Sequence, residues 1–139
     1  MNTSVQMMKM VDTPMPDIDM AMMQECIEAC AACEQACTTC ADMCAAEGMA
    51  GTAKCMAICM NCADMCNTMM RMMMRPTGMD MPTLTMMLEA CIAMCRACAD
   101  ECMSHSEMSE HCKACAEVCR NCVTACEAML ASIQSAMTQ

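Results

Sequence analysis

The stretch LEACIAMCRACADEC at residues 88–102 decides the fold. Its cysteines, Cys91, Cys95, Cys98 and Cys102, are separated by steps of four, three and four residues. Alternating steps of three and four place side chains on one stripe of an α-helix. Alanine and methionine, which are strong helix formers, occupy many of the positions between them. The stretch therefore predicts a helix with one face made of thiols.

The same spacing recurs in three other blocks, so that the chain carries four thiol stripes in succession. Together the four blocks contain all 19 cysteines: Cys26, Cys30, Cys33, Cys37, Cys40, Cys44; Cys55, Cys59, Cys62, Cys66; Cys91, Cys95, Cys98, Cys102; Cys112, Cys115, Cys119, Cys122, Cys126. Short separators between helices favour antiparallel neighbours. We predict an all-α fold, an antiparallel up-down four-helix bundle whose core is lined by cysteine.

Breaker and cap residues set the expected bounds of the helices. We predict helices at residues 18–46, 52–74, 82–103 and 107–136, which form a bundle over residues 18–139. Side chains that can cap a helix N-terminus stand near each predicted start: Asp17 or Asp19, Thr52, Asp80 or Thr83, and Ser106 or Ser109. Residues 1–17 show no helical period and are predicted to be a flexible, methionine-rich tail.

The composition excludes several functional classes. The chain has 139 residues, 19 Cys, 27 Met, no aromatic residue and a net charge of −10. The length suits one domain. An acidic chain without aromatic side chains lacks both the basic surface and the stacking platforms that nucleic-acid binding uses, so we expect no nucleic-acid partner. Charged or polar residues interrupt the apolar runs before about 18 residues, so we also expect no membrane partner.

A high cysteine content in a short chain is typical of secreted disulfide scaffolds. Three observations argue against that interpretation here: the number of cysteines is odd, the first 20 residues lack the apolar segment of a signal peptide, and glycine and proline number only 3 and 4. Reduced thiols in a cytosol-like compartment are the preferred interpretation, and clustered thiols there usually bind metal. An enzyme would need one or two distinguished thiols, not 19 equivalent ones, so we expect no catalysis.

Soft thiolates select Cu(I), zinc or iron–sulfur clusters. Residues i and i+4 of a helix bring their Cβ atoms about 5–6 Å apart, and a two-coordinate Cu(I) needs sulfurs about 4–4.5 Å apart. One Cu(I) per bridging thiolate leaves the core neutral, whereas several zinc ions with four thiolates each would bury negative charge. Iron–sulfur proteins use short loop motifs that are missing from this sequence. We therefore expect many Cu(I) ions per chain, in a core that would be underpacked when empty. Zn or Cd detoxification of the metallothionein kind is the alternative.

The residues 88–102, His105 and the stretch EHCKACAEVCRNC at residues 110–122 resemble the four-helix-bundle copper storage proteins of the cytosolic, histidine-containing type. The similarity covers roughly residues 20–130. It implies a cytoplasmic homotetramer that stores or buffers Cu(I) on the thiolates from Cys26 to Cys126. It also implies an uptake region formed by His105, His111, Met43 and Met49. The donor or acceptor of the copper is not implied.

The methionine content exceeds what that family pattern needs, and many methionines gather at the end opposite the histidines. Met69, Met73, Met87 and Met129 continue the thiol stripes past the last cysteines. Methionine is a flexible apolar side chain and can simply plug that end. The alternative is that these thioethers, as neutral soft ligands, bind additional or exchangeable Cu(I). At the other end, the two histidines are either solvated loop residues or Cu(I) ligands.

Overall fold

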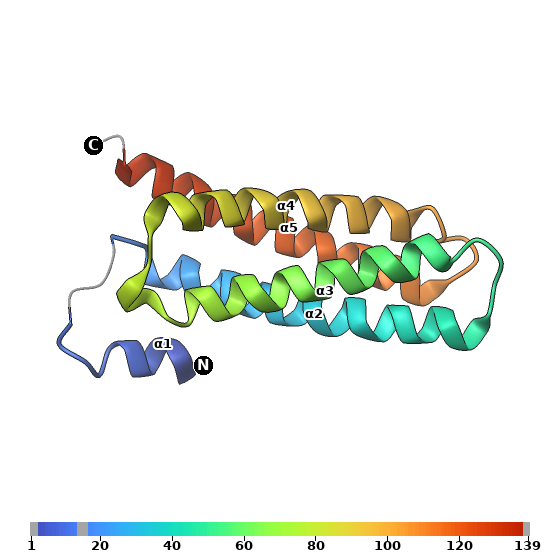
Figure 1. The fold of residues 1–139 in the computed structure, drawn as a ribbon, viewed down its shortest axis with the longest axis horizontal. Helices are drawn as coiled ribbons and strands as arrows, with labels where there is room; N and C mark the ends of the chain where they lie inside the picture. The colour runs from blue at the N-terminus through green and yellow to red at the C-terminus, as the bar shows by residue number, and fades with distance from the viewer. Residues whose placement is uncertain (1–2, 14–16, 138–139) are drawn as a thin grey trace.

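Four long helices run back and forth along one axis, and a short N-terminal helix lies at one end of them (Figure 1). The computed structural model describes residues 3–13 and 17–137, and within these ranges all regular structure is helical. The bundle consists of α2 (Met20–Glu47), α3 (Ala53–Met73), α4 (Met81–Met103) and α5 (Glu110–Met137). The additional elements are α1 (Thr3–Met8) and a single 3₁₀ turn, η1 (Pro76–Gly78), between α3 and α4. The sequence predicted these four long helices at 18–46, 52–74, 82–103 and 107–136.

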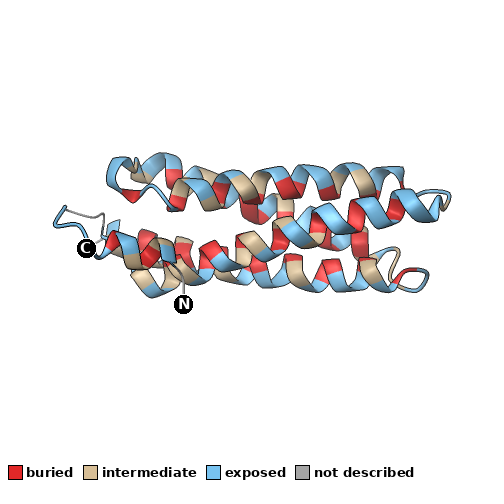
Figure 2. Ribbon diagram, turned by 90° about the horizontal axis from the view of Figure 1, so that it is seen from below, coloured by how far each residue is buried: buried red, intermediate tan, exposed pale blue. Residues whose placement is uncertain are grey.

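The helices form a square bundle in which consecutive helices are antiparallel. Helix α2 packs along α3 and α5, and α4 packs along the same two neighbours. Buried residues form a continuous stripe on the inner face of each helix, while the outer faces are exposed (Figure 2). Each stripe contains the cysteines of its helix, as the spacing predicted. The predicted all-α, cysteine-lined four-helix bundle is confirmed.

Local signals in the sequence explain where the helices begin and end. The Asp19 side chain accepts hydrogen bonds from the backbone N–H groups of Ala21 and Met22, and so caps α2. Gly48 ends α2 with φ +61°, a left-handed conformation that suits glycine, and its N–H bonds to the Cys44 carbonyl. Asp80 caps α4 by accepting from the Thr83 N–H.

The cap expected at Thr52 is not formed. Its backbone has helical angles, and its hydroxyl donates to the Met49 carbonyl at 2.8 Å and not to the start of α3. At the next loop, Ser109 accepts from the Cys112 N–H at 3.4 Å, which makes it the cap of α5. The two loops lie at the same end of the bundle (Figure 1), and Thr52 and Ser109 are both buried there.

The N-terminal residues are more ordered than an irregular tail. Thr3–Met8 form α1, and its Val5 and Met8 side chains are 2% and 8% exposed. Helix α1 shares a surface pocket with the end of α3 and the turn η1, so it lies beside the methionine-rich end of the bundle (Figure 1). Val5 and Met8, three residues apart, lie on the same face of this six-residue helix. A helix this short has too few residues for its period to be recognised in the sequence. Residues 1–2 and 14–16 of the predicted tail lie outside the described residues.

Helix α4 meets the length and hydropathy of a membrane span, with a mean hydropathy of 1.2 over its best window. Glu89 and Arg96 interrupt this stretch, as the sequence predicts, and the average hydropathy is high in spite of them. Only 33% of that window is buried, and its buried residues are the α4 contribution to the bundle core. Core helices of bundles commonly pass the same test.

Candidate metal centre

The core of the bundle is made chiefly of sulfur. All 19 cysteines are free thiols, and each is at most 2% exposed. They come from the inner faces of α2, α3, α4 and α5, where the alternating spacing holds them in register. Free, buried and convergent thiols can take up a soft metal ion once they lose their protons.

The closest sulfur contacts join different helices. The Sγ atoms lie 3.6 Å apart in three such pairs: Cys26–Cys126, Cys59–Cys102 and Cys66–Cys95. Pairs four residues apart on one helix are longer, 3.9 Å for Cys33–Cys37 and 4.0 Å for Cys122–Cys126. The spacing of the cysteines predicts clamps within one helix, but the cross-helix contacts are closer, because they depend on how the helices face one another.

These distances also differ from the expectation of an underpacked core. Atoms this close are in van der Waals contact, so neighbouring thiols fill the space between the helices. A linear S–Cu–S bridge needs about 4–4.5 Å between its sulfurs. Replacing a shared thiol proton by Cu(I) therefore requires the paired sulfurs to separate by only about half an ångström.

Groups of four thiols are arranged so that all ligand atoms lie within 4.8 Å of one another. One group takes a single cysteine from each long helix: Cys30, Cys66, Cys91 and Cys122. Two neighbouring groups share Cys33 and Cys62, and further along Cys37 and Cys119 are shared in the same way. Since one sulfur serves more than one group, the arrangement is suited to bridging thiolates and a continuous cluster. Separate tetrahedral sites would each need their own four ligands.

Hydrogen bonds between thiols divide them into stronger and weaker acids. The hydrogen bond from Cys126 lowers the pKa of Cys26 to about 5. The hydrogen bond from Cys102 lowers the pKa of Cys40 to about 6. Burial raises the pKa of Cys44 to about 11. Part of the core is thus inclined to be thiolate before metal arrives, and the rest must release a proton on binding.

At one end of the bundle, His111 extends the thiol core. Its Nδ1 atom lies 3.3 Å from the Cys40 sulfur and 3.8 Å from the Cys112 sulfur. With Cys44, these residues form a compact group of three thiols and one imidazole. The other ring nitrogen, Nε2, contacts the Glu47 carboxylate at 2.5 Å. Burial alone would lower the pKa of His111, but the hydrogen bond to Glu47 and the contact with Cys40 raise it overall.

The other residues expected at this end do not join that group. His105 is bound through Nε2 to Glu101 at 3.3 Å, and Lys54 approaches the same carboxylate at 3.9 Å. Met43 is 38% exposed on the surface of α2, and Met49 is half-buried in the loop after it. The two histidines, predicted to act together, therefore have different partners in the structure. The sequence alone did not single out Glu47 and Glu101, whose positions become informative only once the loops are folded.

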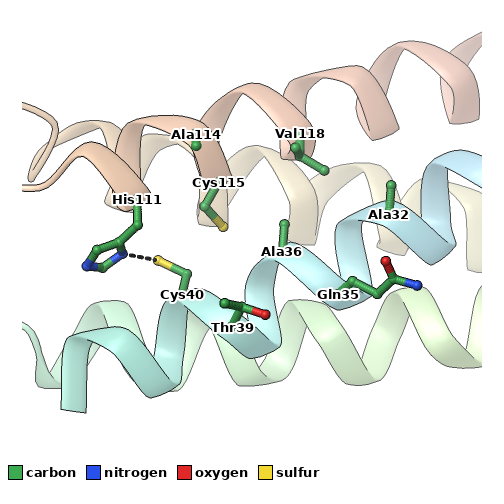
Figure 3. A pocket seen from close by; sticks show the side chains of 9 residues that line it. All are labelled: Ala32, Gln35, Ala36, Thr39, Cys40, His111, Ala114, Cys115 and Val118. Carbon is green, nitrogen blue, oxygen red and sulfur yellow. Dashed lines mark hydrogen bonds between the residues drawn. The ribbon is translucent and has the colours of Figure 1, made fainter. Parts of the chain in front are cut away.

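A surface groove of about 380 Å³ between α2 and α5 leads to the same group (Figure 3). Three of its lining residues are alanines, and Cys40 and Cys115 also line it. His111 stands at one end, with its ring turned toward Cys40. Cys40, Cys44 and Cys115 are also the cysteines with measurable exposure, at 1–2%. This is where the described surface comes nearest to the thiol core.

At the opposite end, the methionines predicted to continue the thiol stripes are mostly inside the bundle. Met69, Met73 and Met129 are completely buried. Met87 is only half-buried, because Leu84 and Leu88 occupy the inner face of α4. Met87 thus packs against the core from its margin. On α2, Met23 precedes Cys26 by three residues and is completely buried as well.

The family and structural comparisons agree with this geometry. The sequence profile of the family described as copper storage protein matches residues 19–131. A search of curated proteins finds no match. The matched range includes every cysteine of the bundle and both histidines.

Several solved structures are similar to the chain over most of its length. The Streptomyces lividans copper storage protein Ccsp, loaded with 10 copper equivalents, is 40% identical with a TM-score of 0.88, covering 93% of this chain and 98% of that chain. A structure of the cytosolic protein from the same organism with five coppers is 46% identical with a TM-score of 0.78, covering 80% and 93%. The Cu(I)-bound copper storage protein BsCsp3 is 31% identical with a TM-score of 0.70, covering 78% and 98%.

Proposed function

The chain belongs to the copper storage protein family, and on that premise we propose that its 19 core cysteines hold a store of Cu(I) as one chain of bridged thiolates. The sharing of Cys33, Cys37, Cys62 and Cys119 between neighbouring four-thiol groups carries this proposal. Each Cu(I) displaces the proton of a thiol, so one ion per thiolate keeps the buried core near neutrality. The protein acts by binding alone and is not an enzyme.

Copper loads and leaves through the end that carries His111. The imidazole, Cys40 and Cys112 form a mixed nitrogen–sulfur group beside the least buried thiols. Neutral imidazole holds Cu(I) less tightly than thiolate does, so an ion captured there moves inward down an affinity gradient. His105, Met43 and Met49, which the family resemblance assigns to uptake, lie at the same end without joining the group or lining the groove. The groove between α2 and α5 gives an ion or its carrier access to Cys40 from the side.

The working compartment is the cytoplasm, where reductants keep the thiols free. A cytosolic relative with five bound coppers and the 19 free cysteines of this chain support this assignment. Four copies assemble into a homotetramer, as the family resemblance implies, and light scattering of the apo and loaded protein tests that assembly.

Anaerobic titration of the reduced protein tests the proposed function. Cu(I) is added in the presence of a competing chromogenic chelator, and we expect more than about ten ions per chain to be withheld from it. The matched experiment uses Zn(II), which we expect to saturate after a few ions and to be displaced by Cu(I). Tight zinc retention with poor Cu(I) uptake would support the metallothionein-like alternative and overturn the storage assignment.

A further inference from the structure

The thiol core ends against a layer of three methionines and one leucine. We call Met23, Met69, Leu88 and Met129 the thioether layer. Each long helix contributes one of these residues, and each side chain is completely buried. The layer therefore lies in the dry interior, at the end of the bundle opposite His111.

Helix register places the layer directly beside the last thiols. Met23 precedes Cys26 by three residues, and Met129 follows Cys126 by three. Three residues of helix advance about 4.5 Å along the axis. Because the Cys26 and Cys126 sulfurs are 3.6 Å apart, the antiparallel helices α2 and α5 bring Met23 and Met129 to the same level.

Helices α3 and α4 place the other two residues by the same helical rise. Met69 follows Cys66 by three residues and Leu88 precedes Cys91 by three. Cys66 and Cys91 belong to one four-thiol group, so Met69 and Leu88 also share a level. That group also contains Cys30 and Cys122, which lie about one turn inside Cys26 and Cys126. Met69 and Leu88 therefore stand at about the level of the Cys26–Cys126 pair, and Met23 and Met129 lie about one turn beyond it. The three thioethers thus border this pair from beside it and from the outer side.

Packing alone does not explain three methionines at these positions. Branched aliphatic side chains fill the same end where only packing is needed, as Leu84, Leu88 and Ile133 show. Leucine matches methionine in helix propensity and loses less side-chain entropy on burial. Three leucines would therefore stabilise this end of the bundle more than three methionines do. What methionine adds is a neutral sulfur donor, which is a ligand for Cu(I).

We propose that Met23, Met69 and Met129 bind one Cu(I) ion together with a thiolate of the Cys26–Cys126 pair. On binding, the S–H bond of Cys26 or Cys126 breaks, the proton passes to solvent and a Cu–S bond forms, so this ion is the one that balances that thiolate, while the thioethers only donate lone pairs. The single thiolate matters because Cu(I) bound by thioethers alone would leave a positive charge in the dry interior. This inference rests on the proposed filling of the thiol core with Cu(I), and it adds a closing site of a different chemical kind.

The test compares two triple variants of the full chain in the same anaerobic Cu(I) titration. The first is Met23→Leu, Met69→Leu and Met129→Leu, and Leu88 already shows that leucine fits this layer. The control is Met86→Leu, Met108→Leu and Met137→Leu, at positions 61%, 66% and 58% exposed. We expect the capacity of the first variant to fall by about one ion per chain and that of the control to equal the wild type. Equal capacity in all three proteins overturns the proposal. A wild type that takes up only a few ions would instead overturn the storage function itself.

A second measurement follows the methionines in the wild-type protein itself. Wild-type protein labelled with ¹³C at the methionine methyl groups is titrated with Cu(I), and each single Leu variant assigns one resonance. We expect the Met23, Met69 and Met129 resonances to shift together at one addition, while Met86, Met108 and Met137 stay in place. Unshifted layer resonances at full loading also overturn the proposal.

Discussion

His111 presents its Nδ1 atom to the Cys40 sulfur at 3.3 Å. Glu47, the last residue of α2, holds the ring in that orientation, because its carboxylate is hydrogen-bonded to the other ring nitrogen, Nε2. When the Nε2–H group donates a hydrogen bond to a carboxylate, the ring proton stays on Nε2 and the Nδ1 lone pair is free to bind a metal ion. The helix end thus positions a nitrogen ligand at the margin of the thiol core.

Removing the Glu47 carboxylate tests this relationship. We expect Glu47→Ala to weaken Cu(I) binding at the His111 group by about tenfold or more, since loss of such outer partners typically costs that much. Glu47→Gln keeps an oxygen acceptor and should remain close to the wild type. Competition with a chelator at low copper loading measures the affinity. The matched control is Glu101→Ala, which removes the partner of His105 outside the group. An equal loss in that control contradicts the role given to Glu47.

The position of a cysteine along the core should decide how much copper its loss removes. The Cys37 sulfur contacts those of Cys33, Cys98, Cys119 and Cys115 at 3.7–3.9 Å. Cys44, near the end, contacts the Cys112 sulfur at 3.8 Å. We expect Cys37→Ser to remove several Cu(I) ions per chain and Cys44→Ser about one, because a bridging thiolate serves several ions. Metal analysis after gel filtration gives both numbers. Equal losses would indicate separate sites in place of one connected cluster.

Copper retention should weaken as the pH falls, because protons compete with Cu(I) for the same sulfurs. The pKa of Cys26 is lowered to about 5 and that of Cys40 to about 6, so these thiolates persist to mildly acid pH. Burial raises the pKa of Cys44 to about 11, so this thiol releases its proton only when metal displaces it. We expect proton release on loading at pH 7, and a steep fall in affinity as the pH drops through 6 to 5. Competition titrations at several pH values, corrected for the chelator's own protonation, measure this. An affinity independent of pH would exclude thiolates as the ligands.

The N-terminal helix should contribute to stability and not to storage. Val5 is 2% exposed, so a carboxylate there would be buried and would detach α1. We expect Val5→Asp to make the chain sensitive to trypsin at Lys9 while its Cu(I) capacity stays unchanged. Met7→Asp, at a position 59% exposed, is the matched control and should keep the resistance of the wild type. Equal cleavage of the two variants would show that α1 is not held by Val5.

Much of the bundle follows from the spacing of the cysteines, because a strict alternation of three and four fixes one face of each helix. The same rule, applied strictly, also identifies the residues beyond the last thiols. In α4 the first step between cysteines is four, from Cys91 to Cys95, so the step before Cys91 must be three and leads to Leu88. Met87 lies four residues before Cys91, so its selection would require two successive steps of four. The structure places Met87 off the inner face of α4.

Other features of the site depend on contacts between segments distant in sequence. The separation of His111 from His105 arises because one faces Cys40 across the bundle while the other bonds to Glu101 on its own turn. The closest sulfur pairs likewise cross from helix to helix, as in Cys26 and Cys126. Helical period fixes which face a residue occupies, but not which residues of the neighbouring helix stand opposite.

The crowding of thiols also makes the emptied bundle vulnerable to oxidants. A disulfide needs its sulfurs about 2.05 Å apart, and the Cys26 and Cys126 sulfurs at 3.6 Å need to approach by only about 1.5 Å. Such a bond would fasten α2 to α5 and remove two ligands at once. Bound Cu(I) occupies the same lone pairs and keeps the sulfurs apart, so the filled protein is shielded from this reaction. Reductant must therefore be available while the copper leaves. Without it, disulfides between the emptied thiols would prevent the protein from being filled again.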